Sequence, residues 1–186
     1  MSRPNWFRKV HVPLTIVCGA PGAGKSTYVR THAGPQDLVV CFDRIATRLF
    51  GRPSTLRPQA SLSREDVQHV LRARNDMLAD LMRASAKGRW PRAWLILSEP
   101  VAANRQWWAD TLKARVVVLV VPAGECLCRI AQDAAAGDER GAGAQQFVRE
   151  WWAQYGPARC DVTIIESAQF APRPSEQSEA RGGPNV

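Results

Sequence analysis

The chain has 186 residues, of which 45% are hydrophobic and 23% charged, and its 25 Lys and Arg residues against 17 Asp and Glu give a formal net charge of +8. This length and apolar content suit one domain with a full core, and they exclude a disordered chain, a collagen and a disulfide-stabilised miniprotein. No apolar run approaches the roughly 20 residues that a membrane span requires.

Apolar runs alternate with helical patterns along the chain. After a loose N-terminal arm (residues 1–10), short β-branched runs predict buried strands at 14–18, 37–42, 93–97, 115–121 and 161–165. Helical spacing of apolar residues predicts helices at 24–33, 45–50, 63–86, 101–113, 124–134 and 144–155. The helix from Ser63 opens with a capping-box pattern, because Asp66 follows three positions later. Residues 171–186 lack apolar side chains other than Pro, Ala and Val, and are expected to form a disordered tail.

The alternation predicts the fold class. Strands that are apolar throughout, separated by helices, are typical of a parallel sheet covered on both faces. We therefore expect a three-layer α/β/α sandwich with a five-stranded, mainly parallel sheet. The strands and their crossovers occupy nearly the whole chain, so one domain is expected over residues 1–170.

The segment between the first strand and the first helix matches a phosphate-binding pattern. Residues 19–26, GAPGAGKS, fit G-x-x-x-x-G-K-[ST] at every specified position. Glycines allow the backbone N–H groups to surround a phosphate, and the helix N-terminus adds its positive end. Lys25 would place a charge between the β- and γ-phosphates, and Ser26 would ligate Mg²⁺. The residues expected to hold a nucleoside triphosphate are Gly19, Ala20, Pro21, Gly22, Ala23, Gly24, Lys25, Ser26 and Thr27.

These features resemble the small P-loop kinases of the nucleoside-monophosphate-kinase type. More narrowly, the chain is similar to the polynucleotide-kinase and zeta-toxin branch, including AAA_33-like P-loop proteins common in phage genomes. The motifs that carry the resemblance are VCGAPGAGKSTYVR (17–30), LVVCFD (38–43) and VVVLVVPAGECLCRI (116–130), extended by Arg140 and WWAQY (151–155). The resemblance implies transfer of the γ-phosphate of ATP, with Mg²⁺, to a hydroxyl.

Asp43 follows the second predicted strand, at the sheet edge where open α/β folds bind ligands. In the resembled family such an acid receives the proton of the attacking hydroxyl. Asp is also a favoured N-cap for the helix predicted at 45–50, and both roles can hold together. The polynucleotide-kinase pattern has an arginine three positions after this acid, where this chain has Ala46. Arg44 and Arg48 are therefore the nearby candidates for contact with the acceptor.

Two arginines beyond the fourth strand are candidates for the transition state. The resemblance implies a lid there whose arginines neutralise charge on the transferred phosphoryl group. Arg129 lies in the helix after that strand, and Arg140 in a Gly-rich loop. Solvated surface positions are the alternative for both. Glu99, at the end of the third strand, is a weak version of the acid that holds Mg²⁺ in hydrolytic ATPases.

Positive charge is concentrated between the second and third strands. Residues 44–92 hold eleven Lys and Arg against four acids. In the resembled kinases this segment forms the acceptor side, so the excess favours a polyanionic acceptor. The candidates for phosphate contact are Arg52, Arg57, Arg64, Arg72 and Arg74. A solvated helix face is the alternative, and Arg72 and Arg74 lie on different faces of their helix.

The expected function is an ATP- and Mg²⁺-dependent kinase whose acceptor is the 5′-OH of a nucleic acid. A zeta-toxin-like or metabolite kinase with a small acceptor is one alternative, and a nucleotide-gated module that binds nucleic acid or protein is another. Five cysteines without an export signal favour a reducing compartment, so we expect a cytoplasmic protein without membrane contact. The sequence leaves the oligomeric state open.

Overall fold

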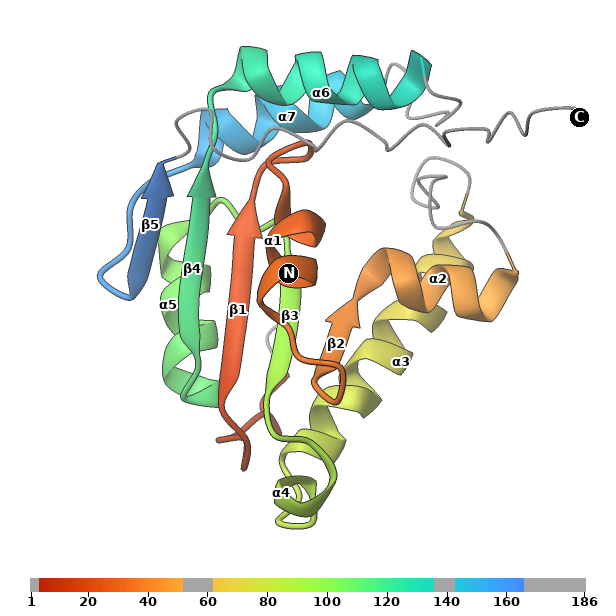
Figure 1. Cartoon of the computed structure of the whole chain (residues 1–186), viewed down its shortest axis with the longest axis vertical. Coiled ribbons are helices and arrows are strands. Elements are labelled where there is room, and N and C mark those ends of the chain that lie inside the picture. Colours follow the sequence, from red (N-terminus) through yellow and green to blue (C-terminus); the bar gives the residue numbers. More distant parts are fainter. Residues whose placement is uncertain (1–3, 52–61, 136–142, 166–186) are drawn as a thin grey trace, which may run out of the picture.

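The computed structural model describes residues 4–51, 62–135 and 143–165 (Figure 1). Its centre is a five-stranded sheet with the strand order β2-β3-β1-β4-β5. Every strand pair among the described residues is parallel, which confirms the predicted α/β class. The sheet was predicted to be mainly parallel, and within this part of the chain it is entirely so. The strands are β1 (Leu14–Gly19), β2 (Leu38–Cys41), β3 (Ala93–Leu97), β4 (Arg115–Val120) and β5 (Asp161–Ile165).

The strand at the centre of the sheet is β1, which carries the phosphate loop at its carboxyl end. Ile16 pairs with Leu95 of β3 on one side and with Val116 of β4 on the other. All three side chains are buried. Because both faces of these strands are covered, apolar residues occupy consecutive positions, as the sequence pattern predicted.

Helices cover both faces of the sheet and its carboxyl edge (Figure 1). In that view α1 lies in front of the sheet, α3 and α5 lie behind it, and α6 and α7 cross above the strand arrowheads. The helices are α1 (Lys25–His32), α2 (Phe42–Phe50), α3 (Arg64–Leu81), α4 (Ala86–Arg89), α5 (Ala102–Leu112), α6 (Ala123–Ala135) and α7 (Gly143–Gln154). Within the described ranges no helix is both long and apolar enough to span a membrane.

The helix predicted over 63–86 is shorter than expected, because α3 ends at Leu81 and α4 is a separate helix from Ala86. Its start is confirmed, since Ser63 caps α3 in a reciprocal capping box with Asp66. The helix ends at Leu81, whose carbonyl accepts a hydrogen bond from the backbone N–H of His11 at 2.8 Å. The N-terminal segment thus supplies a partner to a carbonyl left free by the helix end, and the chain turns before α4 begins.

The N-terminal arm is packed rather than loose. Phe7 and Val10 are buried, and the Phe7 ring stacks on Trp107 of α5 with centroids 6.2 Å apart. The expectation of a loose arm is therefore wrong for residues 4–10, because three aromatic side chains bury one another there. The predicted disordered tail, 171–186, lies outside the described residues.

Candidate active site

The phosphate loop joins β1 to α1 and needs glycine at two positions. Gly22 and Gly24 have φ values of +78° and +83°, in the left-handed region that disfavours residues with a Cβ. A Cβ at Gly22 would also lie 2.5 Å from the backbone oxygen of Cys126 in α6. Glycine at these positions lets the loop fold tightly beneath α6, with Gly24 as the N-cap of α1.

Lys25 lies over its own loop. Its Nζ donates hydrogen bonds to the carbonyl oxygens of Gly19, at 2.9 Å, and Ala20, at 2.7 Å. These contacts hold the ammonium at the mouth of the loop, where it can meet a phosphate. Ser26, in the first turn of α1, has an exposed side chain. The loop thus combines glycines that leave no room for Cβ atoms, the cation of Lys25 and the exposed hydroxyl of Ser26. These features fit a nucleoside triphosphate with Mg²⁺.

A cleft of about 270 Å³ opens beside the loop, at the carboxyl edge of the sheet. It combines residues from the loop and α1, from α2, from the segment after β3, and from α7. Those lining it are Pro21, Lys25, Asp43, Ser98, Pro100, Phe147, Glu150, Trp151 and Gln154. Asp43 and Lys25, which are 18 positions apart in the sequence, therefore face one space.

Asp43 reaches the cleft because β2 passes directly into α2. The strand ends at Cys41, which is also the helix N-cap, and the helix begins at Phe42. Asp43 is thus in the first turn of the helix, and its expected role as an N-cap is wrong. Its half-buried carboxylate makes no hydrogen bond or ion pair with any other described residue. A carboxylate so placed is available to accept a proton.

The α7 residues of the cleft were missed from the sequence. Phe147, Glu150, Trp151 and Gln154 follow i, i+3, i+4, i+7 spacing, so they share one helix face. Phe147 is 46% exposed, although it is a large hydrophobic residue. The indole N–H of the buried Trp151 finds no acceptor among the described residues. A helix face that carries both aromatic and polar side chains was the available sequence signal for a binding site. Apolar periodicity alone predicts only that one side of the helix is buried.

Arg129 lies next to the phosphate loop. Its Nε donates to Glu125 Oε1 at 2.9 Å, and one of its terminal nitrogens would lie 3.7 Å from a Cβ at Gly24. The helix after β4 therefore brings a guanidinium to the loop. Arg140, the second expected arginine, lies outside the described residues.

The arginines expected at the acceptor are dispersed. Arg44 and Arg48 are exposed on α2, whereas Arg72 of α3 lines a separate groove with Leu49, Phe50, His69, Ala73 and Asp76. Ala46, at the position of the family's arginine, is buried in the core. An arginine at that position in this chain would have to enter the core.

Arg74 is buried, which is unsuited to the phosphate contact expected of it. It is 8% exposed, donates to Asn75 Oδ1 at 3.1 and 3.3 Å, and lies 5.8 Å from the centre of the Trp108 ring. Burial lowers the pKa of its guanidinium. Its expected role is wrong because α3 turns this position toward α5. Arg52 and Arg57 lie outside the described residues.

The basic segment also spans the whole height of the domain. Arg83, Lys87, Arg89 and Arg92 lie in or near α4 and the start of β3, at the amino end of the sheet. The expectation that this segment's charge gathers on the acceptor side is wrong for these four residues. The 18-residue α3 carries the chain from the carboxyl edge to the opposite end.

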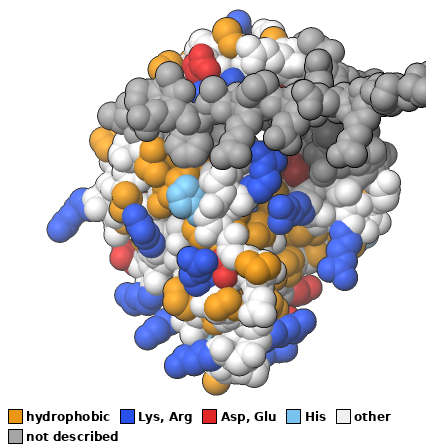
Figure 2. Space-filling view, in the orientation of Figure 1, with side chains coloured by type: hydrophobic (Ala, Val, Ile, Leu, Met, Phe, Trp, Pro, Cys, Tyr) orange, Lys and Arg blue, Asp and Glu red, His pale blue; other side chains and the backbone are white. Residues whose placement is uncertain are grey.

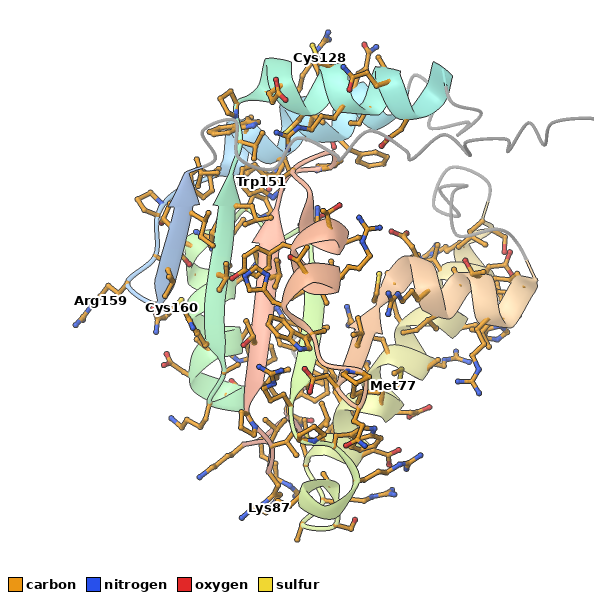
Figure 3. The ribbon with its side chains drawn as sticks, viewed as in Figure 1. Met77, Lys87, Cys128, Trp151, Arg159 and Cys160 are labelled. Atoms are coloured by element: carbon orange, nitrogen blue, oxygen red, sulfur yellow. The ribbon has the colours of Figure 1, made fainter. Side chains whose placement is uncertain are left out.

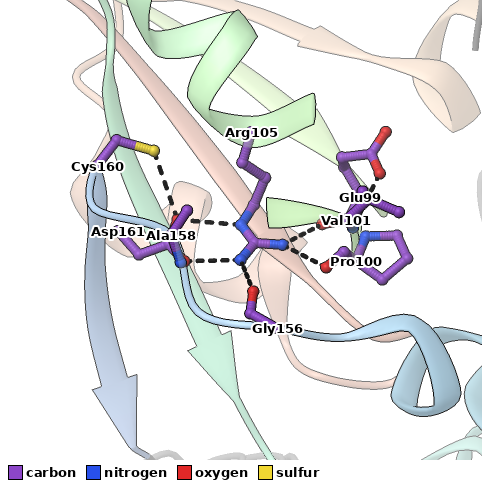
Figure 4. Close-up of polar contacts among 8 residues, drawn as sticks. All are labelled: Glu99, Pro100, Val101, Arg105, Gly156, Ala158, Cys160 and Asp161. Carbon is purple, nitrogen blue, oxygen red and sulfur yellow. Dashed lines mark hydrogen bonds and ion pairs between the residues drawn. The ribbon is translucent and has the colours of Figure 1, made fainter. Parts of the chain in front are cut away.

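Glu99 holds the start of α5. It is 5% exposed, and its Oε1 accepts the backbone N–H of Val101 at 3.1 Å (Figure 4). It does not line the cleft, whereas the adjacent Ser98 does. The contact of the Glu99 carboxylate with a helix start is a structural role that the sequence pattern left open.

Proteins of known structure share the fold described above. A family model, AAA_33, described as an AAA domain, matches residues 14–156. A chain of the Pnkp1/Rnl/Hen1 RNA repair complex is similar with a TM-score of 0.58 and 17% identity, covering 82% of this chain and 46% of that one. A "putative kinase" from Chloroflexus aurantiacus j-10-fl gives 0.55 and 17%, covering 83% and 88%. No curated protein sequence matches.

These similarities concern the fold. At 17% identity they confirm the P-loop α/β architecture that the motifs predicted. The chain spans less than half the length of the chain from the RNA repair complex. The family match covers most of this chain, including the phosphate loop, Asp43 and Arg129.

Proposed function

This chain belongs to the AAA_33 family of AAA domains. From that premise we propose that it is a kinase, which transfers the γ-phosphate of ATP to a hydroxyl. The proposed acceptor is the hydroxyl at the 5′ end of a nucleic acid. The observation that carries the proposal is the carboxylate of Asp43, which pairs with no other described residue and lies in the cleft that Lys25 also lines. A nucleotide-gated binding module has no need of a free base at that point. A phosphotransferase does, because the attacking hydroxyl must lose its proton.

The donor side follows from the loop. Its backbone N–H groups and Lys25 would bind the phosphates, and the Ser26 hydroxyl would ligate Mg²⁺. The metal, when bound, neutralises charge on the phosphate oxygens. Arg129, whose guanidinium lies beside Gly24, would neutralise the charge that develops on the transferred group.

The transfer step uses Asp43 as general base. Its carboxylate accepts the proton of the acceptor hydroxyl while that oxygen forms a bond to the γ-phosphorus. The bond from the γ-phosphorus to the bridging oxygen breaks, and the electron pair leaves with ADP. Because the transition state is loose, correct placement of the two oxygens contributes most of the catalysis.

The four α7 residues of the cleft, which we call the α7 wall, support a nucleoside at the acceptor position. The exposed ring of Phe147 offers a stacking surface for a base or sugar, and Glu150 and Gln154 offer hydrogen-bond partners for sugar hydroxyls. Asp43 and Glu150 are two carboxylates in the cleft, and they disfavour an acceptor that brings a phosphate of its own into it. A terminal nucleoside can bind the α7 side chains while its own phosphate stays outside the cleft, toward the exposed Arg44 and Arg48.

A small polyhydroxy acceptor is the second candidate. The same observation favours it, since two carboxylates and an amide suit several hydroxyl groups, and the cleft is small. It differs from the first candidate in needing no phosphate contact outside the cleft.

The test is transfer from γ-labelled ATP. The acceptors are a 5′-OH oligonucleotide, the same oligonucleotide with a 5′-phosphate, and a set of small sugars and polyols. The variants are wild type, Asp43→Asn and, as a matched control, Asp110→Asn, an exposed acid on α5. We expect Mg²⁺-dependent label on the 5′-OH oligonucleotide alone. We also expect Asp43→Asn to lose at least about 100-fold in rate while its affinity for ATP is kept.

Other outcomes discriminate between the candidates. Label on small polyols alone would replace the nucleic-acid acceptor by the second candidate. ATP binding without label on any acceptor would overturn the kinase proposal and favour the gated module.

A further inference from the structure

A band of basic side chains surrounds the amino end of the sheet, opposite the cleft. Figure 2 shows blue side chains around the lower part of the molecule, the end that carries α4 in Figure 1. We call this surface the amino-end face. It comprises eight exposed residues: Arg8, Lys9, Arg83, Lys87, Arg89, Arg92, Lys113 and Arg115.

Backbone hydrogen bonds bring these segments together from four parts of the chain. The N–H of Val10 donates to the carbonyl of Leu112, at the end of α5, and the N–H of His11 donates to that of Leu81, at the end of α3. The N–H of Ala93, the first residue of β3, donates to the carbonyl of Pro13 at 2.9 Å. The N-terminal segment therefore lies across the ends of both helices and beside β3, next to the basic residues that flank them.

Acidic residues compensate little of this charge. Asp80 pairs with Arg83 at 2.9 Å, and the buried Asp37 pairs with Arg92 at 3.2 Å. A third acid, Asp110, lies in the last turn of α5 and accepts a hydrogen bond from Gln106. Within the described part of the chain, the other six members of the face form no ion pair. An excess of positive charge remains on one end of a small domain.

We propose that the amino-end face binds the phosphate backbone of a nucleic acid, at a surface separate from the catalytic cleft. Clustered Lys and Arg side chains that are exposed and unpaired release counterions when they meet phosphates, which is the main source of sequence-independent affinity. Strands of five to six residues separate the face from the cleft by about 17–20 Å. In Figure 3, Lys87 points away from α4 at the end opposite Trp151 of the cleft. The proposal does not depend on the kinase activity.

The face suits a nucleic acid better than an anionic membrane. A surface that binds lipid adds apolar side chains that insert below the headgroups. Four large hydrophobic residues are exposed in the described ranges, and three of them lie on α2, α7 and β5. Only Trp6 belongs to a segment that contributes to the face.

The test compares two double variants with the same change in net charge. Lys87→Glu with Arg115→Glu alters the face, and Arg30→Glu with Arg149→Glu alters exposed positions on α1 and α7. Binding of a single-stranded oligonucleotide with phosphates at both ends is measured by fluorescence anisotropy between 50 and about 200 mM salt, without ATP. Because both ends carry phosphates, this oligonucleotide has no terminal hydroxyl to bind in the cleft. Its binding therefore reports on the amino-end face alone. Thermal unfolding of both variants verifies that they fold.

We expect the face variant to lose at least about tenfold in affinity at low salt. We also expect the slope of log K against log salt to become less steep by about 1.4, because each phosphate contact of a single strand contributes about 0.7. The control variant should lose less than about threefold. Equal losses in the two variants, no loss in either, or binding of anionic vesicles in place of the oligonucleotide would each overturn the proposal.

Discussion

The guanidinium of Arg105 donates to both carboxylate oxygens of Asp161, from Nε to Oδ1 at 3.0 Å and from Nη2 to Oδ2 at 2.7 Å (Figure 4). Neither side chain is more than 2% exposed. The same guanidinium donates to the carbonyl of Pro100 at 2.6 Å and to that of Gly156. One buried group thus connects β5, the cleft wall after β3 and the segment that follows α7.

Removal of one partner of this pair should destabilise the protein strongly. Asp161→Asn leaves a buried guanidinium without its counter-charge, and we expect a loss of about 3–5 kcal/mol in the free energy of unfolding. Burial by itself would lower the pKa of Arg105, but the hydrogen bonds and charge of Asp161 outweigh it and raise that pKa. Chemical denaturation measures the loss, with Asp110→Asn as the control within about 0.5 kcal/mol. Equal stability of the two variants would contradict this assignment.

The phosphate loop should not tolerate a methyl group at Gly22. Gly22→Ala places a Cβ 2.5 Å from the Cys126 oxygen at a positive φ, so the loop must move. We expect at least about tenfold weaker binding of ATP, because displaced N–H groups no longer converge on the phosphates. Gly124→Ala is the matched control, since nothing lies within 4 Å of a Cβ there. Calorimetric titration with ATP should show normal affinity for that control.

Arg129 should act on the rate more than on binding. Arg129→Gln removes the guanidinium beside Gly24, and we expect about a thousandfold lower kcat, as for arginines that stabilise transferred phosphoryl groups. The affinity for ATP should change less than about tenfold. Arg149→Gln on α7 provides a control at an exposed position. A change in KM for ATP at unchanged kcat would assign Arg129 to ground-state binding instead.

The α7 wall should govern the acceptor. Phe147→Ala and Glu150→Ala are each expected to raise the KM for the acceptor about tenfold, because they remove a stacking surface or a hydrogen-bond acceptor worth about 1–3 kcal/mol. The affinity for ATP should stay unchanged, since the loop holds the donor. Steady-state kinetics at varied acceptor concentration provides the measurement. An effect confined to the KM for ATP would move these residues to the donor side.

Asp37 should make stability depend on acidic pH. Burial by itself would raise its pKa, but hydrogen bonds from Trp94 and Gly34 and the charge of Arg92 outweigh it, so the pKa lies below its ordinary value. A lowered pKa contributes stability above the unfolded value of about 3.9, and that contribution is lost as the pH falls further.

The matching variant is Asp37→Asn. It should be less stable than wild type at pH 7 and at pH 5, and the difference should shrink below about pH 4. Urea unfolding at the three pH values is the measurement. A difference that stays constant down to pH 3 would show that the charge of Asp37 does not contribute.

Local pattern was sufficient for the five strands, for the start of α3 and for the position of the phosphate loop between β1 and α1. The apolar runs predicted five strands at their observed positions, and the Ser63–Asp66 pair predicted the start of α3. The phosphate loop was readable because its geometry is set within eight consecutive residues. Asp43 was predicted at the sheet edge because parallel strands all end at that edge.

Only the tertiary structure decided what α7 contributes, where the arginines lie and what Glu99 does. Phe147 and Glu150 line the same cleft as Asp43 because α7 crosses the carboxyl edge. No local pattern encodes this proximity of segments about a hundred residues apart. Arg74 is buried and Lys87 lies at the far end because α3 packs on α5 and spans the domain. Periodicity states which residues share a face of a helix, whereas packing decides what that face meets.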